Sequence, residues 1–307
     1  VVDHATRDRL VAGDPKSDEL LKPFLRGRDV KRWVAESPER YLIRIESSEN
    51  RHHPWTGKKD KEAERVFAET YPAIHKHLDQ FRDGLIRRDD QGKYFWELRS
   101  CAYWGEFDLP GVVYPELALT PQYAYTDGGS ICDCTLYTIP SAEIHILGIL
   151  NSRVVTMFFS QISPKVRGSY MRFKAVYMSQ IPIPRVGPQT VPKMDVLVAA
   201  LSFFHADDSG FVSQSHSRDP LMRDYYEEIL NALVYELYLP DDLHTAGLHF
   251  FDLVTAANLP RVDRGPCDPA AQLAALRRKF EEIYAPSHAL RAALQKLHTL
   301  DPIRIIE

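Results

Sequence analysis

The pattern of hydrophobic and polar positions predicts short strands and helices in the first half of the chain. Apolar residues about 3.6 positions apart predict helix over 60–88, with a break at Pro72 because proline has no backbone N–H to donate. The pair Gly128-Gly129 predicts a turn. β-Branched and aromatic residues bounded by polar ones predict strands at 41–45, 94–98, 111–114 and 131–139.

Longer helices are predicted after residue 140. The segment 142–160 is apolar on most sides, which indicates a buried helix, and Ser141 is its expected N-cap. Four prolines and a glycine in 181–192 favour an extended connector. Further helices are expected to begin at Asp219-Pro220, Asp268-Pro269 and Ser287. We therefore expect the α+β class, with a mixed domain of short β-strands and flanking helices at 15–187 and a mainly helical C-terminal region at 195–307.

The composition is that of a soluble globular protein, with 44% hydrophobic and 26% charged residues among 307. It excludes a disordered tail, a collagen-like repeat and a coiled-coil rod. Four cysteines are too few for a disulfide scaffold, so we expect them to be reduced and the protein to be cytoplasmic. The most apolar run, 144–159, contains polar residues and is shorter than the ~20 apolar residues of a membrane span, so no membrane contact is expected.

Charge is unevenly distributed along the chain. Residues 1–190 contain 27 Lys and Arg against 25 Asp and Glu, and residues 191–307 contain 11 against 17. Because the net charges are +2 and −6, any contact with nucleic acid must come from local cationic patches. The chain begins with Val1 and its first methionine is Met157, which we interpret as a piece excised from a longer protein.

Motifs for cofactor binding and nucleophilic catalysis are absent from the sequence. There is no glycine-rich methyltransferase loop, no Asn/Asp-Pro-Pro-aromatic corner, no phosphate-binding loop ending in Lys-Ser/Thr and no Gly-x-Ser-x-Gly elbow. Cys132 and Cys134 lack a second pair at zinc-finger spacing, so we expect packed thiols there. The prediction is a chain with no catalytic residue, metal or cofactor of its own.

A magnesium-dependent nuclease is an alternative function. An acidic residue followed by an acidic-x-Lys pair can hold Mg²⁺ and polarise a water molecule. Asp18 with Asp29 and Lys31 has this outline, although flanking arginines would weaken an acidic metal site. The alternative requires these three side chains to converge in the folded chain.

Two stretches combine cations with aromatic residues and glycine. Residues 22–33 contain five cations, and residues 163–174 contain four cations, two aromatic residues and no acid. Arginine presents a planar fork that fits guanine O6 and N7, whereas lysine presents a point charge for phosphate. Pro23 and Gly27 argue against a continuous helix, so a strand or turn and then a short helical turn are expected in the first stretch. Both stretches favour nucleic-acid binding.

Several strings in a fixed order carry a family resemblance. They are Leu-Lys-Pro-Phe-Leu-Arg-Gly-Arg-Asp-Val-Lys-Arg-Trp at 21–33, Tyr-Phe-Trp-Glu-Leu-Arg-Ser-Cys-Ala-Tyr at 94–103, Leu-Gly-Ile-Leu-Asn-Ser-Arg at 147–153 followed by Gln-Ile-Ser-Pro-Lys-Val-Arg-Gly at 161–168, and Ile-Pro-Ile-Pro at 181–184. Over about 20–185 the chain resembles the C-terminal target-recognition region of type IIG-like restriction–modification enzymes and the N6-adenine DNA methyltransferases of the same lineage.

The resemblance implies recognition without catalysis. In such enzymes a separate N-terminal methyltransferase domain holds S-adenosylmethionine and the Asn-Pro-Pro-aromatic corner, and this chain has neither. The expected partners are therefore double-stranded DNA and that methyltransferase domain of the parent chain. The parent would methylate adenine at N6 in phage defence. The resemblance leaves open whether it also cleaves DNA, for which Mg²⁺ would be needed.

Under this resemblance, residues 15–187 form the DNA target-recognition domain. The expected phosphate contacts are Lys22, Arg26, Lys31, Lys165 and Lys174. The candidate base readers are Arg28, Arg32, Arg99, Arg167 and Arg172. Gly27 and Gly168 would allow the backbone to approach the duplex, and Tyr170 would stack on or wedge between bases.

Two alternatives remain open at this point. Base readers could instead lie in the loops 46–60 or 121–130. In either case Trp33 and Trp96 are expected in the core. The chain could also be a protein–protein adaptor, with an apolar surface on its C-terminal helices and no affinity for DNA.

Overall fold

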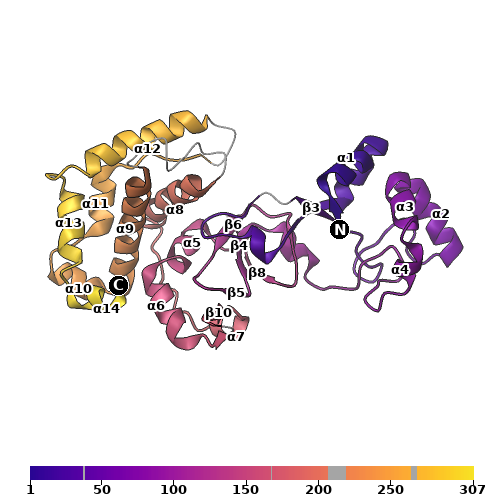
Figure 1. Cartoon of the computed structure of the whole chain (residues 1–307), viewed down its shortest axis with the longest axis horizontal. Helices are drawn as coiled ribbons and strands as arrows, with labels where there is room; N and C mark the ends of the chain where they lie inside the picture. Colours follow the sequence, from indigo (N-terminus) through magenta and orange to yellow (C-terminus); the bar gives the residue numbers. More distant parts are fainter. Residues whose placement is uncertain (37–38, 167, 207–218, 264–267) are drawn as a thin grey trace. The chain divides into compact units, whose positions relative to one another are not determined.

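The chain folds into two compact units. Unit 1 comprises Val1–Asp29, Ser37–Gly111 and Thr126–Ser141, and unit 2 comprises Val30–Glu36, Val112–Tyr125 and Ala142–Glu307. The computed structural model describes residues 1–36, 39–166, 168–206, 219–263 and 268–307 (Figure 1). Helix accounts for 51% and strand for 12%, in small sheets, which confirms the α+β class.

Unit 1 is built on a four-stranded sheet with the order β1-β3-β2-β7. Strand β2 pairs antiparallel with β3, with Leu21 opposite Ile43, and parallel with β7, with Phe24 opposite Ile131. Gly27–Asp29 form a short 3-10 turn after β2, as predicted. The strands are β1 (Val2–Asp3), β2 (Leu21–Leu25), β3 (Arg40–Ile43) and β7 (Ile131–Cys132).

Helices and an aromatic cluster form the core of unit 1. Pro72 occupies the first turn of α3 and ends the preceding helix at residue 70, so the expected break is confirmed. Trp55, Phe67 and Trp96 are buried, and the rings of Phe67 and Trp96 stack with their centroids 5.0 Å apart. The helices are α1 (His4–Gly13), α2 (Asp60–Thr70), α3 (Pro72–Asp79) and α4 (Arg82–Ile86), with 3-10 turns η1 (Pro15–Leu20) and η3 (Trp104–Asp108).

The predicted strand at 94–98 is wrong, because this segment forms a turn around the carboxylate of Glu97. The backbone N–H groups of Lys93 and Tyr94 donate to Glu97 Oε2 at 2.9 and 3.3 Å. An extended strand would carry these donors away from the carboxylate. The same carboxylate accepts a hydrogen bond from the backbone N–H of Ser48, which joins the 46–60 loop to this turn within unit 1.

The predicted strand at 131–139 is two strands. Asp133 Oδ1 accepts hydrogen bonds from the backbone N–H and the hydroxyl of Thr135, which closes a turn between them. Strand β8 (Leu136–Pro140) follows that turn. The predicted turn at Gly128-Gly129 is confirmed by positive φ values of 92° and 78°.

Short strands form part of unit 2. Strand β4 (Gly111–Pro115), most of which lies in this unit, pairs with β6 (Ala124–Thr126). A three-stranded antiparallel sheet has the order β5-β10-β9, formed by Leu117–Ala118, Tyr170–Arg172 and Lys165–Val166. Phe159 and Phe173 stack behind this sheet with centroids 4.5 Å apart.

The predicted helix at 142–160 is two helices, α5 (Ile144–Leu150) and α6 (Arg153–Ile162). The break follows from Asn151, whose side-chain amide pairs with the backbone N–H and carbonyl of Tyr123. The next residue, Ser152, is the N-cap of α6, with its hydroxyl accepting from Val155 N. Ser141 is not the N-cap of α5, because that position belongs to Glu143.

A helical bundle completes unit 2, and α9 lies at its centre (Figure 1). Helix α9 packs against α6, α8 and α10 to α13, and 12 of its residues are buried. The predicted start at Asp268-Pro269 is confirmed, whereas the last predicted helix is capped by His288 instead of Ser287. The structure describes α9 from Asp219 onward, so the start predicted at Asp219-Pro220 stays a prediction. The helices are α7 (Ala175–Met178), α8 (Val191–His205), α9 (Asp219–Tyr238), α10 (Pro240–Thr245), α11 (Phe250–Ala257), α12 (Pro269–Ile283), α13 (Ala289–Leu297) and α14 (Asp301–Ile306).

The predicted connector has no regular structure over 182–187. The compact units do not divide there, since α8 packs on α5 within unit 2. The functional division into 15–187 and 195–307 stays a prediction. In the part of the chain that the structure describes, none of the helices has the length and apolar character needed to cross a bilayer.

Candidate nucleic-acid interface

Strand β10 and the two extended residues that follow it present three of the predicted DNA contacts on one face. Alternate residues of a strand point to opposite sides. Met171 and Phe173 are 5% and 1% exposed and pack into unit 2, so Tyr170, Arg172 and Lys174 lie on the other side. Tyr170 is 41% exposed, and the side chains of Arg172 and Lys174 are 38% and 45% exposed. We call these three residues the β10 face.

Glu116 holds the two cations of the β10 face. Its carboxylate lies 3.5 Å from Arg172 Nε and 3.9 Å from Lys174 Nζ. The backbone N–H of Phe173 donates to the carbonyl of Glu116, which fixes the distance between the two segments. These long, partly exposed ion pairs orient the cations and are weak enough to exchange for a phosphate.

The β9–β10 hairpin carries the other cations of this stretch. Lys165 is exposed and pairs with Met171 across the two strands. Gly168 has a φ of 80° at the turn, where glycine is tolerated without strain. Arg167 lies outside the described residues.

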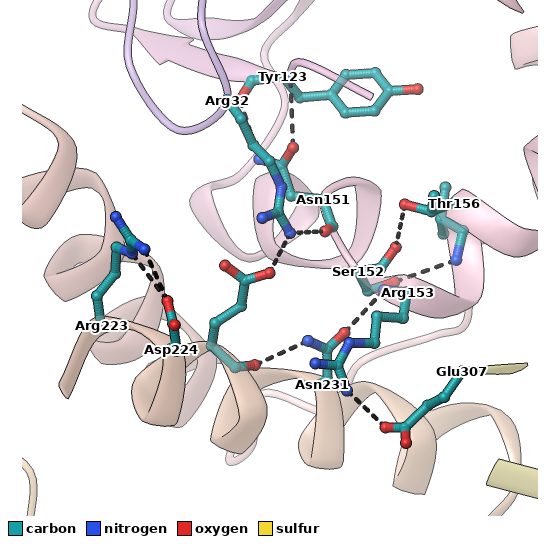
Figure 2. Close-up of polar contacts among 12 residues, drawn as sticks. Arg32, Tyr123, Asn151, Ser152, Arg153, Thr156, Arg223, Asp224, Asn231 and Glu307 are labelled. Carbon is teal, nitrogen blue, oxygen red and sulfur yellow. Dashed lines mark hydrogen bonds and ion pairs between the residues drawn. The ribbon is translucent and has the colours of Figure 1, made fainter. Parts of the chain in front are cut away.

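Arg32 is engaged in ion pairing and hydrogen bonding within unit 2. Figure 2 shows its guanidinium beside Asn151, whose carbonyl accepts a hydrogen bond from Nη2 at 2.7 Å. The same Nη2 lies 2.6 Å from Glu227 Oε1 on α9. Reading a base with Arg32 would require these contacts to break. Trp33 is 1% exposed, so the core position predicted for it is confirmed. Lys31 is exposed.

The first cationic stretch begins in unit 1, on β2 and the turn that follows. Arg26 forms a two-pronged pair with Asp29, through Nε and Nη2 at 2.9 Å each. Burial alone would raise the pKa of Asp29, but its hydrogen bonds with Arg26 hold that pKa below the usual range. Arg28 is 68% exposed and Lys22 is partly exposed, so both keep surface for a ligand. Gly27 donates its N–H to Thr135 Oγ1 at 2.9 Å.

Arg99 lies at a groove of about 560 Å³ in unit 1. Its guanidinium is 62% exposed and 3.8 Å from Asp90. The groove is also lined by Cys132 and Cys134, but β7 ends at Cys132, so the two thiols do not share one strand face. Burial raises the pKa of Cys132 to about 12, which keeps this thiol protonated.

The nuclease alternative finds no support in these contacts. Asp18 pairs with Arg7 at 2.5 Å, and both oxygens of Asp29 accept from Arg26. In the described part of the chain, Asp18 and Asp29 are not among the carboxylate, histidine and cysteine groups whose ligand atoms converge.

Sequence reasoning missed the residues in and next to β5 that lie beside the β10 face. Leu117 is opposite Arg172 in the register and is 39% exposed, and Leu119 is 55% exposed. With Glu116 they lie more than 50 positions before β10, so no local pattern connects them. The loop 121–130 has fewer side chains available to read bases than expected, because Tyr123 and Ala124 are buried.

A family model shows which family the chain belongs to. The model for the TaqI-like C-terminal specificity domain matches residues 22–183, which is more than half of the chain. The chain belongs to the TaqI-like C-terminal specificity domain family. The expected resemblance to a restriction–modification target-recognition region is confirmed.

A solved structure of a type IIL restriction–modification enzyme, MmeI in complex with DNA, is also similar to the chain. The sequence identity is 12% and the TM-score is 0.48, over 92% of this chain and 34% of that enzyme. The chain therefore spans about a third of the length of MmeI.

Membership of the specificity domain family supports a DNA recognition module of a restriction–modification enzyme. It is consistent with a fragment that is not catalytic. All thirteen predicted DNA contacts fall inside the matched range, whereas Asp18 falls outside it. Which of the thirteen touch DNA stays a prediction.

Proposed function

We propose that the specificity domain reads the base sequence of double-stranded DNA through the β9–β10 hairpin. The observation that carries the proposal is the β10 face, where an exposed tyrosine and an arginine of β10 and a lysine of the extended residues after it share one side inside the specificity domain. The major groove of B-DNA admits a two-stranded β-ribbon, and β9–β10 is such a ribbon.

The chemistry of the side chains suggests their roles. Arg172 has the planar fork that binds guanine O6 and N7, so we assign it base reading. Lys165 and Lys174 present point charges and would anchor phosphates, which fixes the register of the hairpin on the duplex. Tyr170, at the start of the strand, is exposed enough to contact a sugar or a base.

Glu116 would prepare the cations for this contact. A carboxylate that holds Arg172 and Lys174 at 3.5 and 3.9 Å keeps both side chains near one orientation before DNA arrives. Less rotational freedom is then lost on binding. Because exposed ion pairs contribute only about 0–1 kcal/mol, exchange of Glu116 for phosphate costs little.

The proposed parent enzyme carries out the chemistry. By the family resemblance, a type IIG-like parent would supply an N-terminal methyltransferase domain that binds S-adenosylmethionine and methylates adenine at N6. If the parent also cleaves DNA, it would use Mg²⁺. This chain would choose the site in cytoplasmic phage defence.

The test is duplex-DNA binding by fluorescence anisotropy with EDTA present, from 50 to 200 mM salt. Of the five predicted phosphate contacts, Arg26 is held by Asp29, so about four remain and log K should fall against log salt with a slope near −3.5. Lys174→Ala should reduce the slope by about 1. Arg278→Ala removes an exposed cation on α12 and should leave it unchanged.

One result would refute the proposal. That result is the absence of duplex-DNA binding at 50 mM salt by both the chain and the full-length parent. The adaptor function would then be preferred.

A further inference from the structure

Three potential metal ligands converge at one corner of the helical bundle in unit 2. Glu236 belongs to the last turn of α9, His244 to α10, and His249 directly precedes α11. One ligand atom from each lies within 4.8 Å of the others. This cluster lies outside the range of the specificity-domain model and outside the predicted DNA contacts.

The local fold brings the two histidines together. Pro240 starts α10 two residues after α9 ends, and Gly247, with a φ of 68°, allows the chain to turn into α11. The imidazole rings of His244 and His249 stack with their centroids 4.6 Å apart. His249 is the N-cap residue of α11, but its side chain makes no capping hydrogen bond, so the ring is available to a ligand.

Glu236 supplies a fixed negative charge beneath the rings. The residue is 7% exposed, and its Oε2 accepts a hydrogen bond from the backbone N–H of Phe251 at 3.0 Å. Its Oε1 lies 2.9 Å from His244 Nε2. Within the described ranges, His244 is the partner found for this carboxylate in an ion pair, and neither lysine nor arginine neutralises it. A buried carboxylate without a permanent cation is costly, and a bound metal ion would offset that cost.

We propose that Glu236, His244 and His249 bind a first-row transition-metal dication of the Zn²⁺ type. The metal would be held by Glu236 Oε1, His244 Nε2 and one ring nitrogen of His249, with a water molecule completing four-coordination. Imidazole nitrogen with carboxylate oxygen suits Zn²⁺, whereas Mg²⁺ and Ca²⁺ prefer oxygen ligands. His244 binds as the neutral imidazole, with its proton on Nδ1.

The present distances require only movement of the exposed side chains. Zn–N and Zn–O bonds of about 2.0–2.2 Å place tetrahedral ligand atoms roughly 3.4 Å apart. The pair Glu236–His244 is already closer than this. His249 is exposed and can rotate inward, while Phe251 N–H keeps the carboxylate in position.

The bound metal would join three helices that are connected by short turns. It would hold the end of α10 and the start of α11 to the end of α9, the central helix of the bundle. Binding to the folded state alone raises the temperature of unfolding. Protons compete for the imidazole nitrogens, so the affinity falls in acidic buffer.

The experiment is a Zn²⁺ titration by calorimetry of the chain, prepared without a histidine tag and stripped with EDTA that is then removed. We expect one equivalent of Zn²⁺, and a visible d–d absorption spectrum typical of four-coordinate metal when Co²⁺ replaces it. His249→Ala and Glu236→Gln should each weaken binding about tenfold or more. The glutamine keeps an oxygen for Phe251 N–H, so the fold is retained.

The matched control is His52→Ala, which removes an exposed histidine of unit 1. It should bind Zn²⁺ like the unchanged chain. Circular dichroism checks that each variant is folded. Absence of a one-equivalent binding step, or equal affinity in His249→Ala, Glu236→Gln and the unchanged chain, would overturn the proposal. Because no DNA is present, these results do not depend on the proposed DNA recognition.

Discussion

Replacing Glu97 should destabilise unit 1 more than any exposed substitution. Its side chain is fully buried at 0% exposure. Oε1 accepts from Ser48 Oγ at 2.5 Å and from Trp55 Nε1 at 2.9 Å. Oε2 accepts from the backbone N–H groups of Ser48, Lys93 and Tyr94 at 3.1, 2.9 and 3.3 Å. One carboxylate therefore joins the 46–60 loop to the turn at 92–98.

The magnitude follows from those five donors. A hydrogen bond to a charged group contributes roughly 1.5–3 kcal/mol, but bonds that share one acceptor do not add. A buried donor left without its acceptor costs roughly 1–3 kcal/mol, and these costs are not additive, so we expect about 4 kcal/mol for Glu97→Ala. Glu97→Gln keeps the volume and one acceptor oxygen but turns an NH₂ group toward donors, so about half of that loss is expected.

The assay is urea unfolding followed by tryptophan fluorescence. Trp55, Trp96 and Trp104 lie in unit 1 and Trp33 lies in unit 2, so the signal reports mainly on unit 1. With an m value of about 2 kcal/mol per M, the midpoint should fall by roughly 2 M for Glu97→Ala. The control is Glu69→Ala, an exposed position on α2. A fall no larger than that of the control would refute the role assigned to Glu97.

Three further predictions concern the scaffold. Gly128→Ala places a Cβ 2.5 Å from the carbonyl oxygen of Asp108 at a φ of 92°, so it should lower the free energy of unfolding in urea by about 2 kcal/mol. Gly129→Ala, whose added Cβ meets open space, should lower it less, and equal losses would contradict this. Arg277→Met should cost about 3 kcal/mol, since it leaves the buried carboxylate of Asp219 without the guanidinium 2.6 Å away. An exposed neighbour, Arg278→Met, should cost little, and similar losses in the two variants would count against the pair. Burial lowers the pKa of His205 to about 4, so the unfolded chain takes up a proton below about pH 6.5 while the folded chain does not. Thermal unfolding by circular dichroism should therefore show stability falling from pH 6.5 to 4.5, less steeply in His205→Leu; identical slopes would disprove the assignment.

The sequence predicted correctly those elements whose structure is decided by residues close to them in the chain. The helix break at Pro72 follows from the missing N–H of that residue, and α12 begins where Asp268 accepts from Ala270 N. Both signals lie within one helical turn, so they are visible in the sequence.

The errors arose where a distant partner decides the local structure. The segment 94–98 has the residues of a strand, but Glu97 bonds to Ser48 and Trp55, about 40–50 positions earlier, and this requires a turn. The helix at 142–160 breaks because Asn151 pairs with Tyr123. Neither interaction is encoded in a local pattern.

The candidate site was predictable only where local sequence decides the position of its side chains. Alternation over 170–174 places Tyr170, Arg172 and Lys174 on one face, and this pattern is local. Glu116, which holds two of these side chains, directly precedes β5 and has no sequence signal. All five cations at 22–33 were predicted to contact DNA, yet Arg26 and Arg32 are engaged by Asp29 and Glu227.

Selection of bound sequences from a random duplex-DNA pool tests the central claim most directly. The chain is incubated with the pool, and the bound duplexes are recovered and sequenced. Sequence-specific recognition predicts enrichment of one defined site, and Arg172→Ala should relax the preference at one base pair, by about 1–3 kcal/mol, while leaving the rest. A bound pool that stays random would contradict the account, because the cations would then contact phosphate without reading bases.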